Sequence, residues 1–406
     1  MKKKWIIALI LILSYQNTKG EEIVELFKQA EKNLLLSKKF SLNQEYYDQL
    51  NKVLKKNRFL NLNSQISYSR IDTKLTHPYN FSLIAISDDI DLFNKTQYDV
   101  RINEIQKEKS NVLVKKDKQL LFKNILSLYT SLLMYNELLK LQEERIIWIR
   151  KNLRFTQKAI SRGIFPSIES SKWESQLLKE KEKLVNYKGN INIIEKNLKT
   201  LCGIKEVKLE KVKLPNKLEN LQSLKAKVLH NNPDLQLLEL DKKILKTTYL
   251  KEKNYWLPTL SIFSEYQINK DPTGNGNQYS IGASLNFKVF NNGKKYKLLS
   301  IKTKEKTLNI LKHQEKIRLI QKINSLYNSV SSGLKSLSLL KKRCRALKDI
   351  LDKYEKAYEM KLCDFTILDN YYKEYVSAKE SYIKTKYRIY LKYQLLKHLS
   401  KGDIYR

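Results

Sequence analysis

Two long stretches without helix-breaking residues constrain this chain most. Residues Lys95–Arg162 contain neither proline nor glycine over 68 positions, and Lys294–Glu359 is interrupted only by Gly333. Proline and glycine are the residues that weaken a helix interior most. At 1.5 Å per residue, each stretch predicts a helix roughly 100 Å long. Such a helix buries its apolar side only by packing lengthwise against other helices.

Four shorter helices are predicted on either side of these two, and their lengths are complementary. A short helix could stack end to end on a returning one, and the pair would then match one long helix. The 3–4 spacing of apolar residues in the first long helix fits a packing seam. The four shorter helices cover Glu22–Lys56, Ser167–Cys202, Leu221–Tyr255 and Lys361–Leu399; the seam residues are Ile125, Leu128, Leu132, Tyr135, Leu139, Ile146 and Ile149.

Four segments alternate apolar and polar residues instead, which predicts strands with one apolar face. Tyr279–Val289 is the clearest, and its length of about ten residues is also what a membrane barrel strand needs. The pattern of Tyr79–Ser87 is blurred by Ile84 and Ile86. The other strands are expected at Phe59–Ile71 and Trp256–Ile268. Turn-rich segments at Asp72–Pro78 and Asn269–Asn277 join the four strands as two β-hairpins. A soluble four-stranded sheet is the alternative.

The two halves of the chain are similar at an offset of 197–198 residues, which predicts a duplicated structural unit. Tyr68 corresponds to Tyr266, and Leu201 to Leu399. The first repeat is expected at 21–203, with its β-hairpin at 59–93 and its helical hairpin at 95–202. A linker follows at 204–220. The second repeat is expected at 221–406, with corresponding hairpins at 256–290 and 294–400.

The first twenty residues have the pattern of a secretory signal peptide. Lys2, Lys3 and Lys4 precede an apolar run from Trp5 to Leu13, and Gly20 fits the position before cleavage. The run is too short to span a bilayer as a helix. We therefore expect export of the chain, with an uncleaved anchor as the alternative.

The charge is strongly positive, at +36 for the whole chain and +32 once the four lysines of residues 1–20 are removed. The lysines are scattered along all the predicted helices among acidic residues, and no nucleic-acid-binding motif occurs, so a nucleic acid partner is not expected. The charge reflects either a compositional bias of the genome or an attraction to anionic lipid or substrate.

No pattern of an enzyme, cofactor site or metal site is found. The four histidines are isolated, and Cys202, Cys344 and Cys363 have no ligand or disulfide spacing. We therefore expect a protein without catalytic, cofactor-binding or metal-binding residues.

Two β-hairpins are too few to close a barrel within one chain. An open sheet in lipid would leave backbone groups without hydrogen-bond partners. If the strands lie in a membrane, the chain must oligomerise, and three copies would supply twelve strands.

Three local motifs resemble the TolC-like outer membrane efflux proteins: Asn232-Pro-Asp-Leu235, Tyr255-Trp-Leu-Pro-Thr-Leu-Ser261 and Phe290-Asn-Asn-Gly-Lys294. Their order and spacing extend the resemblance over nearly all of the chain after residue 20. The resemblance implies a mainly α fold with a small β part, forming a homotrimer with a twelve-stranded β-barrel in the outer membrane and a twelve-helix periplasmic tunnel. It also implies a periplasmic adaptor (membrane fusion protein) and an inner-membrane transporter as partners.

The same resemblance places the adaptor contact at the two helical hairpin turns. The turn residues concerned are Gly163, Ile164 and Phe165 in the first repeat, and Met360, Lys361 and Leu362 in the second. The second turn lacks the glycine of the family pattern. A turn without any partner is the alternative. Asp369 falls where family members often carry an acidic residue that lines a closed aperture, although a solvated position on a helix face would also explain it.

We therefore expect a passive trimeric export duct of a tripartite efflux or secretion system. The alternative is a secreted or envelope-anchored coiled-coil adhesion or scaffold protein without a pore. The two differ in the apolar side of the strands, which would face lipid only in the duct.

Overall fold

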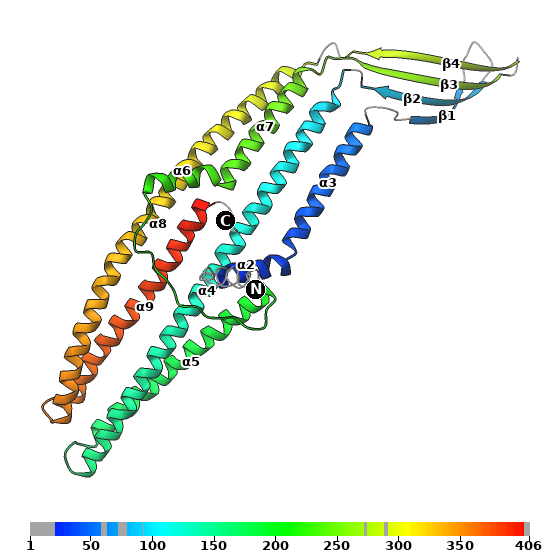
Figure 1. The fold of residues 1–406 in the computed structure, drawn as a ribbon. Helices are drawn as coiled ribbons and strands as arrows, with labels where there is room; N and C mark the ends of the chain where they lie inside the picture. Colours follow the sequence, from blue (N-terminus) through cyan, green and yellow to red (C-terminus); the bar gives the residue numbers. More distant parts are fainter. Residues whose placement is uncertain are drawn as a thin grey trace, which may run out of the picture. The chain divides into compact units, whose positions relative to one another are not determined.

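The computed structural model describes residues 21–57, 63–71, 79–91, 93–271, 274–287 and 291–401. The predicted signal peptide, the turn at 72–78, and Phe59 and Phe290 lie outside these residues. The chain is mainly helical with one small antiparallel sheet (Figure 1). Its elements are α2 (Glu21–Asn33), α3 (Leu36–Lys56), β1 (Asn63–Ile71), β2 (Tyr79–Ile90), α4 (Thr96–Ser161), α5 (Ile168–Cys202), α6 (Leu221–Asn231), α7 (Pro233–Lys253), β3 (Thr259–Asp271), β4 (Gly274–Asn286), α8 (Lys294–Glu359) and α9 (Phe365–Lys401).

The two long helices are confirmed. Helices α4 and α8 have 66 residues each, and α8 continues without a break through Gly333. A Cβ atom at Gly333 would lie 2.7 Å from Cγ1 of Ile389 in α9. The glycine is therefore needed for close packing of two helices and does not interrupt the helix.

Two of the predicted shorter helices are each broken in two. The first breaks at Leu34 and Leu35, where Leu35 has a positive φ of 52°. The second breaks at Asn232, because a residue before a proline avoids the helical conformation and Pro233 begins α7. The prediction of continuous helices over Glu22–Lys56 and Leu221–Tyr255 was therefore wrong.

An asparagine lies at each break, at corresponding positions of the two repeats. The side chain of Asn33 donates hydrogen bonds to the carbonyl oxygens of Thr200 and Leu201, both at 3.1 Å. The side chain of Asn231, 198 residues later, donates to the carbonyl oxygen of Ser400 at 3.0 Å. Each asparagine thus satisfies carbonyl groups at the end of the returning helix, α5 or α9, that have no partner within that helix.

The chain packs as two compact units, and each unit combines segments of both predicted repeats. Unit 1 comprises Met1–Ser37, Lys116–Asn232 and Ile317–Arg406. Unit 2 comprises Lys38–Lys115 and Pro233–Lys316. Helices α4 and α8 contribute to both units.

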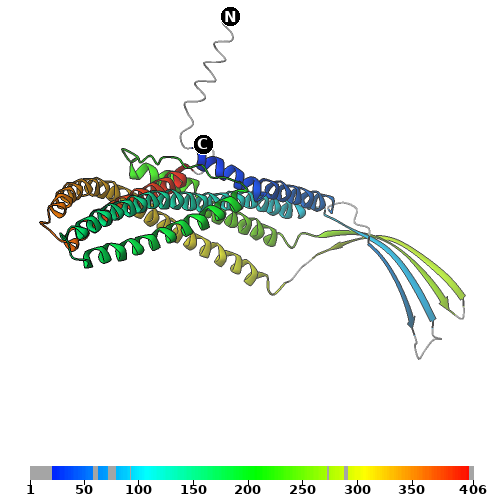
Figure 2. The same cartoon turned by 90° about the horizontal axis from the view of Figure 1, so that it is seen from below.

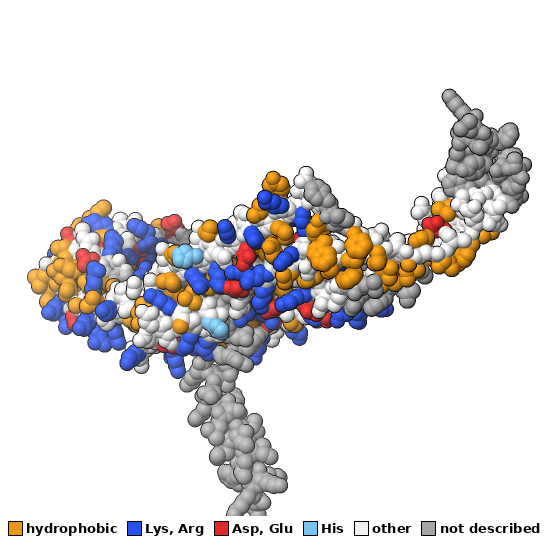
Figure 3. All heavy atoms as spheres, turned by 90° about the horizontal axis from the view of Figure 1, so that it is seen from above, with side chains coloured by type: hydrophobic (Ala, Val, Ile, Leu, Met, Phe, Trp, Pro, Cys, Tyr) orange, Lys and Arg blue, Asp and Glu red, His pale blue; other side chains and the backbone are white. Residues whose placement is uncertain are grey.

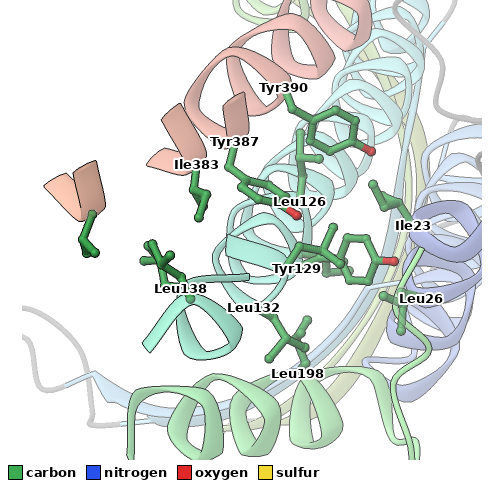
Figure 4. Packing of buried hydrophobic residues seen from close by; sticks show 14 of the residues in the cluster. Ile23, Leu26, Leu126, Tyr129, Leu132, Leu138, Leu198, Ile383, Tyr387 and Tyr390 are labelled. Atoms are coloured by element: carbon green, nitrogen blue, oxygen red, sulfur yellow. The ribbon is translucent and has the colours of Figure 1, made fainter. Parts of the chain in front are cut away.

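Unit 1 holds the main hydrophobic core, which α2, α4, α5, α8 and α9 form together; Figure 4 shows part of it. Tyr129 of α4 lies in this core, and its hydroxyl donates to the carbonyl oxygen of Lys208 at 3.2 Å and accepts from the backbone N–H of Glu210 at 3.0 Å. Burial raises the pKa of Tyr129 to about 12. The segment between α5 and α6 is thereby tied to the core. Of the predicted seam residues, Ile125, Leu132, Ile146 and Ile149 are buried.

Unit 2 contains the sheet, in which the strands follow the order β1-β2-β3-β4 (Figure 2). The pairing of β2 with β3 joins the two hairpins. Strand β3 begins at Thr259 rather than Trp256. The segment Asn269–Asn277 is mostly strand, not turn, because Asp271 pairs with Gly274 and the ladder continues almost to the tip. Among the described residues, no helix is both long and apolar enough to cross a membrane.

Candidate functional site

The turn between α4 and α5 is a helix C-cap built around Gly163, which has a φ of +72°. The N–H of Gly163 donates to the carbonyl of Ile160 at 2.9 Å, and the N–H of Ile164 donates to the carbonyl of Ala159 at 2.8 Å. This pair of bonds defines the Schellman motif, in which glycine is favoured because its backbone adopts the left-handed conformation without steric cost.

The turn between α8 and α9 has the same geometry without a glycine. The N–H of Lys361 donates to the carbonyl of Tyr358 at 3.1 Å, and the N–H of Leu362 donates to the carbonyl of Ala357 at 2.7 Å. Lys361 takes the left-handed conformation, with a φ of 65°. The counterpart of Gly163 is therefore Lys361, 198 residues later, and the missing glycine does not change the form of the turn.

Both turns expose apolar side chains. Ile164 is 39% exposed, Met360 68% and Leu362 77%. Hydrophobic side chains gather at this end of the helices in the space-filling view (Figure 3). Gly163 and Lys361 are exposed as well. The predicted contact residues other than Phe165 thus present a surface of backbone, methyl groups and one ammonium group.

Phe165 is different, because its ring is half-buried and stacks on Tyr358 at 5.2 Å between ring centroids. The hydroxyl of Tyr358 lies 2.9 Å from Oγ1 of Thr156 and accepts from Nε1 of Trp173 at 3.1 Å. The ring of Trp173 meets that of Phe365 edge to face. This aromatic cluster holds the two turns side by side.

The aromatic cluster was missed by the sequence reasoning. Its residues come from two stretches of the chain, 155–173 and 358–365, which lie about 190 positions apart in the sequence. A usable signal was the density of aromatic residues within about fifteen positions of both turns, namely Phe155, Phe165, Trp173, Tyr358 and Phe365.

Asp369 lies on α9 within unit 1 and is only 2% exposed. One carboxylate oxygen pairs with the ammonium of Lys373, and Oδ1 has no hydrogen-bond partner. The carboxylate therefore faces the interior of the unit, and the alternative of a solvated position on a helix face is wrong.

The second candidate surface is the sheet in unit 2, whose register places apolar residues on one face. Ile66 pairs with Ile84, Ile84 with Tyr266, and Tyr266 with Tyr279, so one row across all four strands is apolar. Ile86 and Ile281 lie on the same face. The register thus places Ile84 and Ile86 on the apolar face and Leu83 and Ala85 on the opposite face.

The apolar face of the sheet is open to solvent. Ile66 is 79% exposed and Ile281 69%. The opposite face carries mainly serine, asparagine and glutamine, among them Gln65, Ser280 and Asn286. A sheet with this arrangement in a globular protein would normally bury its apolar side. Here the hydrophobic effect requires another apolar partner.

No group that could hold a metal ion, of three or more His, Cys, Asp and Glu, occurs among the described residues. Burial raises the pKa of the Cys202 thiol to about 11, so this group is protonated at neutral pH.

Comparisons with solved structures identify the fold. Structures with the same fold include the outer-membrane channel OprN (14% identity, 94% of this chain and 90% of that chain covered, TM-score 0.78), VceC from Vibrio cholerae (11%, 93% and 96%, 0.75) and the CmeC channel of Campylobacter jejuni (14%, 94% and 86%, 0.74). The fold is therefore that of outer membrane channel proteins. No curated protein matched the sequence.

A comparison with protein families gives a more specific match than the fold does. Residues 50–204 match the model of the family described as outer membrane efflux protein. The predicted resemblance to TolC-like efflux proteins is thereby confirmed.

Proposed function

We propose that three copies of this chain form the outer membrane channel of a tripartite efflux or secretion system. The exposed apolar face of the four-stranded sheet carries this proposal. In lipid that face is buried at no cost, but the outer edges of β1 and β4 then need backbone partners. Pairing of β4 with β1 of the next copy supplies them, and three copies close a twelve-stranded barrel.

The helices of unit 2 support assembly in the same way. Helix α3 buries no residue in the single chain, and its exposed Leu42, Tyr46 and Val53 are spaced as in a helix-packing seam. Helix α8 exposes Leu299 and Ile310 within unit 2, 11 residues apart, and Ile317 follows seven residues later, where α8 enters unit 1. These two stripes belong to the elements next to the strands with open edges, so the copies would associate through helices and strands together.

In this assembly the helices form a periplasmic tunnel below the barrel, and the duct is passive. We place the contact with a periplasmic adaptor at the two turns, through Ile164, Met360 and Leu362 with Gly163 and Lys361. Phe165 supports this surface from within by its stacking on Tyr358. An inner-membrane transporter would supply energy and select the substrate. We also propose Asp369 as the aperture residue. Its carboxylate is buried within unit 1, so it would reach the lumen only if the helices near the turns rearrange.

A coiled-coil adhesion or scaffold protein without a pore is the competing function. It would explain the long helices, but it gives no partner to the apolar face of the sheet. The match of residues 50–204 to an efflux family also favours the duct.

Purification in detergent followed by reconstitution in planar bilayers tests the proposal. We expect trimers that dissociate on heating and discrete single-channel conductance. A protein that stays monomeric in micelles, or that needs no detergent to remain in solution, would exclude the duct.

A further inference from the structure

The junction between the helices and the sheet of unit 2 is rich in exposed aromatic side chains. Trp256 is 57% exposed and Tyr296 72%, and Phe93 and Phe287 are exposed as well. All four lie within ten residues of the end of a strand. Tryptophan and tyrosine combine an apolar ring with a polar group, and they favour the boundary between hydrocarbon and water. The apolar sheet face therefore ends in a belt suited to lipid headgroups.

Exposed lysines accompany this belt. Lys56 ends α3, Lys253 ends α7, and Lys295 lies in the first turn of α8. Among the described residues, none of these three lysines forms an ion pair. Their charges are therefore available to a ligand.

The lysines at the start of α8 oppose the stability of the helix. Its first turn contains no acidic residue, although the partial positive charge of a helix N-terminus favours acidic groups there. Helix α4 follows the usual rule, since the Asp91 carboxylate accepts from the backbone N–H groups of Lys95 and Thr96 at 2.9 and 2.7 Å. Lysines at a helix N-terminus lower the stability of the helix, and a residue choice that lowers stability without a structural benefit indicates a functional surface.

A neighbouring acid compensates only part of this charge. Glu252 of α7 pairs with Lys294 at 2.8 Å and with Lys297 at 2.7 Å. Lys294 also lies over the ring of Tyr255, 3.9 Å from its centroid. Lys294 and Lys297 are thus held in place, whereas Lys295 between them projects into solvent.

We infer that this junction is a binding surface for anionic phospholipid headgroups, formed by Trp256 and Tyr296 together with Lys56, Lys253 and Lys295. The inference rests on the proposed function, which places the apolar sheet face in a bilayer. Continuity of the belt with that face positions it at headgroup depth, and the ammonium groups are complementary to the phosphate of a lipid such as phosphatidylglycerol. A zwitterionic lipid carries no net charge and would gain nothing from them.

Trp256 provides a reporter at this surface. The other tryptophans are Trp5, which precedes the described residues, and Trp148 and Trp173, which lie in unit 1. The protein without residues 1–20 is reconstituted in nanodiscs of phosphatidylcholine that contain a small fraction of either brominated phosphatidylglycerol or brominated phosphatidylcholine. A Trp256→Phe variant gives the background. Tryptophan quenching then measures which lipid lies at the junction.

We expect brominated phosphatidylglycerol to quench Trp256 about fivefold more effectively than brominated phosphatidylcholine at low salt, since one lysine near an anionic surface contributes an attraction of that order. Salt at about 1 M should remove the preference, because screening then acts within a few ångströms. The triple variant Lys56→Gln, Lys253→Gln, Lys295→Gln should lose the preference. The matched control Lys179→Gln, Lys181→Gln, Lys335→Gln neutralises three exposed lysines of unit 1 and should keep it.

Equal quenching by both lipids, or a preference that survives the triple variant, overturns the inference while the channel proposal stands. Loss of the preference in the control variant also overturns it, because the attraction would then come from total charge. Absence of quenching by either lipid, together with absence of conductance in neutral bilayers, would refute the proposed function itself.

Discussion

Arg145 of α4 and Glu180 of α5 form a buried ion pair, with 3.1 Å between Nη2 and Oε1. Their side chains are 5% and 0% exposed. Gln142 donates to the Glu180 carboxylate at 2.8 Å and Gln176 donates to it at 3.0 Å, whereas Nε of Arg145 has no partner. The pair therefore fixes how the two helices of the first hairpin meet.

Removing one member of this pair should be costly. Glu180→Ala leaves the Arg145 guanidinium buried without its counter-ion, and we expect unfolding to become easier by about 3–5 kcal/mol. Glu380→Ala breaks the exposed pair with Lys384 and should cost no more than about 1 kcal/mol. Denaturant titration compares the two. Equal effects would show that the Arg145–Glu180 pair is solvated.

The left-handed residue of the second turn offers a stabilising change. Lys361→Gly removes the side chain from a residue with a positive φ, a conformation that is unfavourable for residues with a Cβ atom. The substitution should stabilise the fold by about 1 kcal/mol. Gly163→Ala should destabilise it by a similar amount, although a Cβ there meets nothing within 4 Å. Thermal unfolding checks both. A neutral Gly163→Ala would contradict the assigned turn.

The two faces of β4 should respond differently to charge. Ile281→Arg puts a cation on the apolar face and should lower membrane insertion by about 2–4 kcal/mol if the site lies near the bilayer midplane. Ser280→Arg places the same side chain on the polar face and should leave insertion intact but change conductance. Urea titration of the protein in bilayers measures the first effect. If Ser280→Arg lowers membrane insertion more than Ile281→Arg does, the assignment of the two faces is wrong.

The apolar turn surface predicts an effect on adaptor binding. Leu362→Glu should weaken cross-linking to a periplasmic adaptor, since it adds a charge to a side chain that is 77% exposed. Gly163→Phe should do the same. Trimer formation should persist in both variants, because neither residue lies on the seams of α3 and α8. Unchanged cross-linking in both variants would remove the docking assignment.

Stability should depend on pH through His398. Burial lowers the pKa of His398 to about 4, and its ring packs against Phe122 with 4.4 Å between centroids. The unfolded chain binds this proton near its ordinary pKa of 6.5. The unfolded state therefore takes up the proton first, so the stability contributed by neutral His398 is full above about pH 6.5 and falls as the pH drops toward 4.

The loss over this range should reach at most about 3.4 kcal/mol, from 1.36 kcal/mol per pKa unit. Substitution of His398 by phenylalanine should flatten this part of the profile, while His313→Phe, at an exposed position, should not. Chemical denaturation between pH 4 and 7 measures both. An unchanged slope in His398→Phe would assign the pH dependence to other groups.

Local patterns were sufficient to predict the long helices and the strand faces. The helix Lys294–Glu359 was predicted with both ends correct. Proline and glycine affect only the backbone of a few neighbouring residues, so their positions in the sequence are enough to locate the ends of a helix. The alternation of Tyr279–Val289 predicted the apolar face for the same reason. The register between strands then showed that Ile84 and Ile86 belong to that face, which no single strand could reveal.

The break at Leu35 depended on more distant groups, because Asn33 needs the carbonyls at the end of α5 and no local signal precedes it. The break at Asn232 has a local signal in Pro233, and the contact of Asn231 with the carbonyl of Ser400 adds to it only once the hairpins are packed. The stacking of Phe165 on Tyr358 and the burial of Asp369 arise in the same way.

The sequence by itself therefore determined the lengths of the helices, the alternation of the strands and the duplication. The tertiary structure alone decided which residues face one another, including a lysine held in a conformation that glycine would favour. The physical reason is the sequence distance over which each effect acts. Backbone preferences are set by residues within a turn or two of helix, whereas the free energy of burial depends on side chains that come together from positions about 200 residues apart.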